Sequence, residues 1–240
     1  MRTSKYNKGF TLVELAVVIV IIGLIIGAVI KGQELIDNAR VNSVITQVNS
    51  IRSAFTSFQD KYGALPGDFA RAQERIPGCQ AAGGDCANGN GNGTIDGNAG
   101  ANGVAGAEAR MAWQHLAFAN MITGVVPGAD VGQAIYNQNF PGARTGGGFV
   151  LVNGLVGNPQ LNTLWLRLQS SAPTSGPSNG QAQAALTPTQ AATIDRRLDD
   201  GNPLTGTVRA GGFAASCTPA TGEYTESTSS KDCNLYFQIQ

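Results

Sequence analysis

An unbroken apolar run near the start of the chain is the strongest pattern in the sequence. Residues 10–30 read FTLVELAVVIVIIGLIIGAVI, with one charged side chain, Glu14. Because about 20 apolar residues cross the hydrocarbon core of a bilayer as an α-helix, the run predicts a transmembrane segment. The basic residues Arg2, Lys5 and Lys8 precede it without an acid. By the positive-inside bias, this asymmetry predicts a cytoplasmic N-terminus, with the rest of the chain across the membrane.

Apolar residues continue at helical spacing beyond this segment. They recur at alternating intervals of three and four residues, at Val41, Val44, Val48, Ile51, Phe55, Phe58 and Tyr62. The spacing predicts one helix over residues 10–62, whose second half has an apolar stripe. Gly63, with Pro66 shortly after it, ends the pattern. The stripe fits either a coiled coil or burial against a globular domain, and we favour burial because the pattern covers only a few turns.

Residues 63–240 are expected to form a globular domain rich in glycine loops. A broad apolar face predicts a helix over residues 108–121. Thr187 is placed as an N-cap, with Pro188 and Gln190 at the first and third helical positions, so a second helix is expected to about residue 198. Short apolar runs predict strands at residues 148–152, 161–168, 208–213 and 235–239. Together with the long N-terminal helix these elements predict an α+β fold, in which the helix packs on a small antiparallel sheet.

Composition and charge narrow the classes of function. The 240 residues contain 16 basic and 16 acidic side chains, so nucleic-acid binding that neutralises many phosphates is not inferred. One histidine and four cysteines offer little material for a zinc site or a histidine-based triad. His115 is expected at the surface or half-buried on its helix. Asp195, Asp199 and Asp200 are expected to form a solvated helix end rather than a catalytic pair, and we expect that the protein is not an enzyme.

The N-terminus does not fit a cleavable secretory signal. Such a signal has an apolar core of about 7–15 residues and a small-x-small cleavage site after it. Here the run is longer and no Ala-x-Ala follows it; the small residue is Gly9, in front of the run. Cleavage after Gly9 would remove a basic leader, residues 1–9. The mature chain would then begin at Phe10 and keep its membrane helix.

The segment Lys8-Gly9-Phe10-Thr11-Leu12-Val13-Glu14 resembles the type IV prepilin motif, which type IV pilins share with the pseudopilins of type II secretion. The resemblance implies that a prepilin peptidase cuts between Gly9 and Phe10 and methylates the new amino terminus. It also implies that Glu14 is the assembly residue. In a filament away from water this carboxylate would need a partner, and the ammonium of Phe10 on a neighbouring subunit is the expected one.

Further expectations follow from the same resemblance. The chain would be a structural subunit, a pilin or minor pseudopilin, of a type IV pilus or a type II secretion pseudopilus. It would be held in the bacterial inner membrane by a single pass, with a periplasmic C-terminal domain, and would later form part of a filament in the periplasm or at the cell surface. Its partners would be the peptidase, other subunits in a helical homo- or hetero-filament, and an inner-membrane assembly platform with its ATPase.

Two features of the membrane segment leave its packing open. Gly23 and Gly27 form a G-x-x-x-G pair, a spacing that lets helices approach closely. The segment Ile30-Lys31-Gly32-Gln33 stands where many pilins have a helix-interrupting proline. That departure favours a minor or atypical subunit. The alternative function is a single-pass, membrane-anchored periplasmic binding protein that does not polymerise.

The four cysteines are expected to form disulfides, because they lie in the part of the chain predicted to be exported. Three pairings are possible. We favour Cys79 with Cys86 and Cys217 with Cys233, since each closes a loop within one region. The second loop is similar to the cysteine-bounded loop of many pilins. Crossed pairings stay open for the case in which the two regions adjoin.

An asparagine-rich loop raises the question of calcium. Asn88, Asn90 and Asn92, followed by Gly93 and Ile95, have the spacing of a calcium-binding loop. The first position lacks an aspartate, and Ala99 stands where a bidentate glutamate belongs, so Asp85, Asp96 or Glu108 would have to supply charge. Asn-Gly steps also favour ordinary turns. We therefore expect no cofactor and keep calcium as an open alternative.

Overall fold

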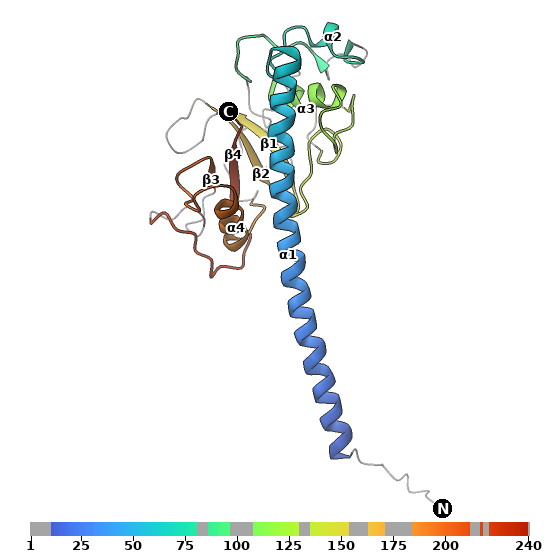
Figure 1. Ribbon diagram of the computed structural model, residues 1–240, viewed down its shortest axis with the longest axis vertical. Coiled ribbons are helices and arrows are strands. Elements are labelled where there is room, and N and C mark those ends of the chain that lie inside the picture. Colours follow the sequence, from blue (N-terminus) through green and yellow to red (C-terminus); the bar gives the residue numbers. More distant parts are fainter. Residues whose placement is uncertain are drawn as a thin grey trace, which may run out of the picture. The chain divides into compact units, whose positions relative to one another are not determined.

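The computed structural model describes residues 11–80, 86–96, 108–129, 135–153, 163–170, 184–211, 217 and 221–239. One long helix, α1, runs over Leu12–Tyr62 (Figure 1). The chain divides into two compact units, Met1–Arg40 and Val41–Gln240. The helix α1 contributes residues to both units, and its apolar stripe from Val41 onward is buried in the second unit.

In the first unit, α1 has no buried side chain among its described residues. Its most apolar 18-residue window has a mean hydropathy of 3.0, and among the described helices α1 alone is long and apolar enough to cross a membrane. Large apolar side chains from Leu12 to Ile36 are about half exposed or more. A soluble monomer rarely presents so much contiguous apolar surface, so this segment needs lipid or protein around it.

In the second unit, the helix supplies one wall of the core. Every member of the predicted stripe is buried apart from Tyr62, which is half-buried, so the expectation of burial on a globular domain is confirmed. Phe55 meets Trp113 of α3 (Glu108–Phe118) edge-on, with ring centroids 6.3 Å apart. The helix ends at Tyr62. Gly63 follows with a φ of +70°, which suits a glycine, and its N–H donates to the Gln59 carbonyl at 2.8 Å.

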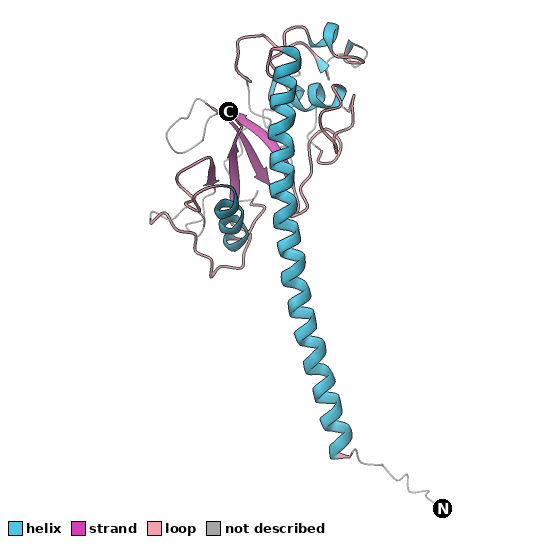
Figure 2. Ribbon diagram, viewed as in Figure 1, coloured by secondary structure: helices cyan, strands magenta, loops and turns pink. Residues whose placement is uncertain are grey.

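A four-stranded antiparallel sheet forms the centre of this unit, as expected (Figure 2). The strands are β1 (Gly148–Asn153), β2 (Leu164–Gln169), β3 (Val208–Gly211) and β4 (Asn234–Gln238), and they fall on the four predicted runs. Their order across the sheet is β1-β2-β4-β3. The middle strands β2 and β4 pair Arg167 with Tyr236. Strands β1 and β2 are buried on both faces, and their side chains join those of α1 in one core.

Besides α1, the described chain contains two helices that were predicted and one that was not. The helix expected over residues 108–121 is α3, which ends earlier, at Phe118. The second is α4, Pro188–Leu198, with Thr187 as its N-cap. The additional helix is α2, Ala72–Arg75, a single turn too short to show a periodic pattern.

Side chains in the second half of α1 also form hydrogen bonds with distant segments of the same unit. The Gln47 amide donates to the Gly142 carbonyl at 2.9 Å, and the Arg52 guanidinium donates to the Gln238 carbonyl at 3.1 Å. Arg197 of α4 donates to Asn42. These bonds cross 95 or more residues of sequence, so they fix the second half of α1 to segments from the far end of the chain.

Two disulfides close local loops in this unit. Cys79 is bonded to Cys86, and Cys217 is bonded to Cys233; both are the pairings favoured from the sequence. All four residues are fully buried. The backbone of Cys233 also forms an isolated antiparallel β-bridge with Leu186, just before α4. The second disulfide therefore joins the start of β4 to Cys217 in the segment before it, and a loop of this size contributes about 3 kcal/mol by loop-closure entropy.

Candidate functional site

The beginning of α1 carries a reciprocal pair of hydrogen bonds between Thr11 and Glu14. Oε2 of Glu14 accepts the backbone N–H of Thr11 at 2.9 Å and the Thr11 hydroxyl at 2.9 Å. The Thr11 hydroxyl oxygen in turn accepts the backbone N–H of Glu14 at 3.3 Å. This is a capping box, in which the first turn of the helix satisfies two otherwise unpaired N–H groups. The predicted processing residues Gly9 and Phe10 lie outside the described residues.

The two glycines of the apolar run leave a gap on the surface of α1. A Cβ atom added at Gly23 or Gly27 would meet no atom within 4 Å. The backbone is therefore accessible at both positions within the described chain. Such access permits close helix contact, although it does not by itself select a partner.

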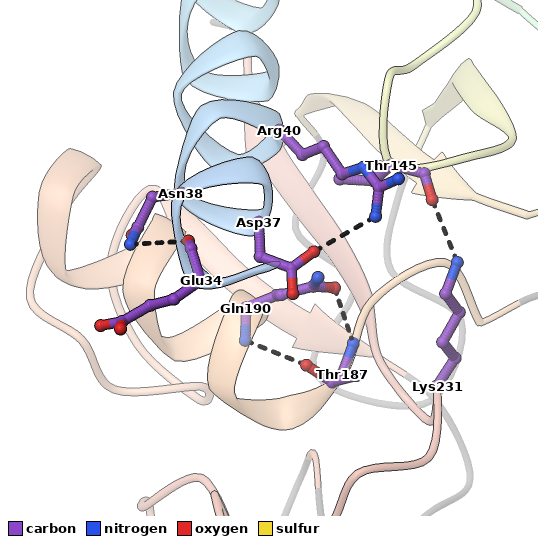
Figure 3. Close-up of polar contacts among 8 residues, drawn as sticks. All are labelled: Glu34, Asp37, Asn38, Arg40, Thr145, Thr187, Gln190 and Lys231. Carbon is purple, nitrogen blue, oxygen red and sulfur yellow. Dashed lines mark hydrogen bonds and ion pairs between the residues drawn. The ribbon is translucent and has the colours of Figure 1, made fainter. Parts of the chain in front are cut away.

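Two ion pairs follow the apolar run on α1, and both are exposed. Lys31 binds Glu34 at 2.8 Å and Arg40 binds Asp37 at 3.2 Å, each three residues apart. Figure 3 shows the second pair, together with the Asn38 amide donating to the Glu34 carbonyl. Exposed pairs of this kind add little to the stability of a helix. Their main effect is that the apolar segment is followed by a polar stretch of helix with balanced charge.

The asparagine-rich loop is held by two buried carboxylates. Asp68 accepts the N–H groups of Asn92 and Gly93 at 3.0 and 2.8 Å. Glu108, at the start of α3, accepts those of Asn90 and Asp96 at 2.8 and 2.7 Å. Burial raises the pKa of Glu108 above its ordinary value. The two acids thus act as backbone acceptors that hold the loop.

Oxygen-bearing side chains of the same loop gather around Asp96. Its Oδ2 accepts the side-chain amides of Asn90 and Asn92, each at 2.8 Å, and Oδ1 accepts the Thr94 hydroxyl at 3.2 Å. These hydrogen bonds lower the pKa of Asp96. The side-chain oxygens of Asn90 and Asn92 accept N–H groups of the loop itself, and Asn88 accepts the Gln73 N–H at 2.9 Å. Ala99, the twelfth position of the calcium pattern, lies outside the described residues.

The loop also lies very close to the segment before α2. The N–H of Gly89 donates to the Phe69 carbonyl at 3.0 Å. A Cβ atom at position 89 would lie 2.3 Å from the Gly67 carbonyl oxygen, so only glycine fits there. The glycine content of this loop therefore has a packing reason at this position.

His115 is fully buried, which corrects the expectation that it lies at or near the surface. Its Nδ1 accepts the Gly67 N–H at 2.9 Å, and its Nε2 lies 2.9 Å from the Ala87 carbonyl, to which it donates. The ring stacks on Phe58 of α1. Burial lowers the pKa of His115 to about 4. The residue joins two loops and α1, a role that depends on residues far away in sequence.

The aspartates at the end of α4 form a structured turn, and Asp195 is fully buried rather than solvated. Asp195 accepts the Tyr224 hydroxyl at 2.8 Å and the Gly201 N–H at 3.2 Å. Burial raises its pKa to about 6. Asp199 accepts the N–H groups of Thr207 and Val208, which leads the chain into β3. The carboxylates therefore close the connection between α4 and β3.

Two groups in the described chain have side chains close enough for a metal ion. Cys79, Cys86 and His115 form the first, and the aspartates of α4 form the second. The sulfur atoms of the first group are joined in a disulfide, so they are not thiolates. In the second group, Asp195 and Asp199 form the hydrogen bonds just described, and Asp200 accepts the Asn202 N–H at 2.9 Å and the Thr205 hydroxyl at 2.6 Å. Both arrangements are explained by the fold alone.

Comparison with known proteins points to the N-terminal segment. Residues 4–30 match the family described as prokaryotic N-terminal methylation motif. This range includes Gly9, Phe10 and the capping box at Thr11 and Glu14. No curated protein matches the chain.

Among solved structures, the chain is similar to the major Type IV pilin PilA1 from Clostridium difficile. The two are 15% identical, and the alignment covers 85% of this chain and 96% of that chain, with a TM-score of 0.36. A TM-score at that level supports no conclusion about this chain. The match that bears on function is therefore the methylation motif, and together with the apolar helix it fits a membrane-anchored chain.

Proposed function

We propose that the chain is a structural subunit, a pilin or minor pseudopilin, that is processed after Gly9 and assembled into a filament through α1. The observation that carries the proposal is the motif match over residues 4–30, directly on a helix whose apolar half has no buried side chain. The motif favours a pilin-like structural subunit over an enzyme.

The apolar half of α1 serves two successive environments in this proposal. In the precursor it crosses the inner membrane, with the basic leader in the cytoplasm and the second unit in the periplasm. In the filament it packs against the helices of neighbouring subunits. Both environments remove the same apolar surface from water, so the helix exchanges lipid contacts for protein contacts without exposure to solvent.

Glu14 is the residue that would favour the filament over the membrane. An ionisable side chain inside a membrane-spanning helix is costly and by default marks a functional site. Pairing with the ammonium of Phe10 on a neighbouring subunit would offset that cost in the filament. It would also set the axial register between subunits. The proposed partners are a prepilin peptidase, other subunits, and an assembly platform with its ATPase, in either a type IV pilus or a type II secretion pseudopilus.

Substitution of Glu14 tests the proposal. Glu14→Ala should insert and be cleaved normally, since an apolar residue makes the span more hydrophobic. Its assembly should fail, because an uncompensated buried charge costs about 3–5 kcal/mol, or roughly a hundredfold or more in the filament fraction. The measurement is subunit in sheared filaments relative to subunit in the membrane. Intact mass should show a chain that begins at Phe10 with one added methyl group.

Val17→Ala, one turn further along α1, is the matched control and should assemble. Wild-type filament levels for Glu14→Ala would show that the charge is not needed. A wild-type chain that is missing from sheared filaments and still begins at Met1 in cells with an active peptidase would favour the alternative. The alternative is a membrane-anchored periplasmic binding protein that does not polymerise.

A further inference from the structure

We propose that Thr11 is a positioning residue, which holds the carboxylate of Glu14 in the orientation from which it pairs during assembly. The inference rests on the proposed function, since it assigns a second residue to the same step. It is carried by the three hydrogen bonds between the two residues at the start of α1.

The geometry restrains one carboxylate oxygen and leaves the other open. Both donors of Thr11, its N–H and its hydroxyl, reach the same atom, Oε2 of Glu14. A glutamate side chain has several rotatable bonds, and two bonds from one residue restrict them to a narrow set of conformations. Among the described residues no hydrogen bond to Oε1 is seen. Oε1 therefore belongs to a restrained side chain and can accept a further donor.

The hydroxyl of Thr11 acts in both directions at once. It donates its hydrogen to Oε2 of Glu14 and accepts the Glu14 backbone N–H. The side chain and backbone of Glu14 are thus both tied to Thr11. Valine, which has the shape of threonine without the hydroxyl, would lose two of the three bonds. Serine would keep all three.

The pairing does not depend on whether the leader has been removed. The N–H that Thr11 donates belongs to the peptide bond between Phe10 and Thr11, whereas the proposed cleavage breaks the bond between Gly9 and Phe10. The same three bonds can therefore form before and after processing. In the membrane they supply the carboxylate with donors that lipid lacks, and in the filament they leave Oε1 for the neighbouring ammonium.

Four substitutions in the full chain test the inference, with the filament fraction expressed relative to processed subunit in the membrane. Thr11→Val should lower this ratio about fivefold to tenfold, as the loss of a helix cap and a charge-assisted bond implies. Thr11→Ser should stay within about twofold of wild type, because it keeps the same donors. Thr56→Val, which removes another hydroxyl on α1, is the matched control and should match wild type. Glu14→Ala should be close to zero.

Thr11→Asp separates positioning from simple helix capping. Aspartate caps a helix as well as threonine does, but it places a like charge beside Glu14. If capping alone matters, this variant should assemble like wild type, and that outcome would overturn the inference. If Thr11 positions Glu14, the variant should be processed and remain in the membrane.

The outcomes distinguish this inference from the proposed function. Wild-type assembly of Thr11→Val, with failure of Glu14→Ala, would overturn the inference alone. Absence of the wild-type chain from filaments would overturn the proposed function, whereas assembly of Glu14→Ala would overturn the role of Glu14 on which the inference rests. A failure of Thr11→Ser equal to that of Thr11→Val would show that the hydroxyl is not what matters, and would also overturn the inference.

A second measurement does not depend on processing. The amide hydrogen exchange of Thr11 is followed by NMR in the full chain, inserted in nanodiscs of zwitterionic lipid. The bond to Oε2 predicts slower exchange in wild type than in Glu14→Ala, by about fivefold or more for a charge-assisted bond. Equal rates would show that the pairing does not form in the membrane.

Discussion

His115 shows how one side chain can join three parts of the fold. Its ring accepts a hydrogen bond from Gly67 and donates one to Ala87 while it stacks on Phe58. This arrangement needs the neutral imidazole, because the protonated ring has no lone pair for the Gly67 N–H. Protonation would thus break one bond and place a charge inside the core. Burial, which disfavours the charged ring, lowers the pKa of His115 to about 4.

A pH dependence of stability follows from His115. Between about pH 6.5 and pH 4 the unfolded chain takes up a proton that the folded chain refuses, so stability is complete above that window and falls as the pH drops through it. The loss should be on the order of 3 kcal/mol. His115→Gln can keep both hydrogen bonds without titrating, so it should be less stable at pH 7.5 but show a flatter profile. Urea unfolding of the full chain in detergent, followed by near-UV circular dichroism, measures both.

Asp195 acts with the opposite sign and must be separated from His115. Its pKa is raised to about 6, so the folded chain holds a proton that the unfolded chain has released. That contribution to stability is present below about pH 4 and is lost as the pH rises through 6. Because Asp195 is common to both proteins, the difference between wild type and His115→Gln cancels it. Equal profiles would contradict the role assigned to His115.

At the scale of elements, α4 is defined by its first turn. Thr187 accepts the Gln190 N–H at 3.3 Å, and the Gln190 side chain accepts the Thr187 N–H at 3.2 Å, as Figure 3 shows. Pro188 follows at a position where a missing N–H costs nothing. Ala191, Ala192 and Ile194 of the same helix are buried. The capping box therefore sets where a core-forming helix begins.

Removal of this cap should have a measurable cost. Thr187→Ala should lower the free energy of unfolding by about 1 kcal/mol, which corresponds to about 2–4 °C in Tm for a chain of this size. Thr187→Ser should retain most of the stability. The control is Thr193→Ala, which removes a hydroxyl in the same helix that donates to the carbonyl of Thr189, and it should be neutral or slightly stabilising. Equal losses for both alanine variants would show that the cap is not the cause.

Local pattern predicted these elements well, because their signals lie within one segment. The stripe of α1, the cap of α4 and the four apolar runs of the sheet are each complete within a few residues of sequence. The single turn α2 lacks such a pattern. The burial of His115 and Asp195 could not be predicted in this way, since their partners Gly67 and Tyr224 lie 48 and 29 residues away. In the N-terminal site, the spacing of Thr11 and Glu14 carries the capping-box signal.

At the scale of the whole molecule, the buried core belongs to one of the two compact units. Every buried apolar residue of the described chain lies between Val41 and Phe237, and the described residues of α1 before Val41 contribute none. The second half of α1 is a wall of this core, whereas the first half is apolar surface for another environment. The two halves of one continuous helix thus have separate physical roles.

A chain that begins at Val41 is therefore expected to fold without a membrane. Exported to an oxidising compartment so that both disulfides form, residues 41–240 should give a soluble monomer with cooperative unfolding and a near-UV circular dichroism spectrum like that of the full chain. A chain of residues 56–240 is the matched comparison. It lacks the stripe from Val41 to Phe55 and so exposes the core around Trp113, with a loss well above the few kcal/mol of a single core deletion. It should aggregate or lack fixed tertiary structure. If residues 41–240 behaved in the same way, the apolar half of α1 would be part of the folded core, and the assignment of separate roles to its two halves would be wrong.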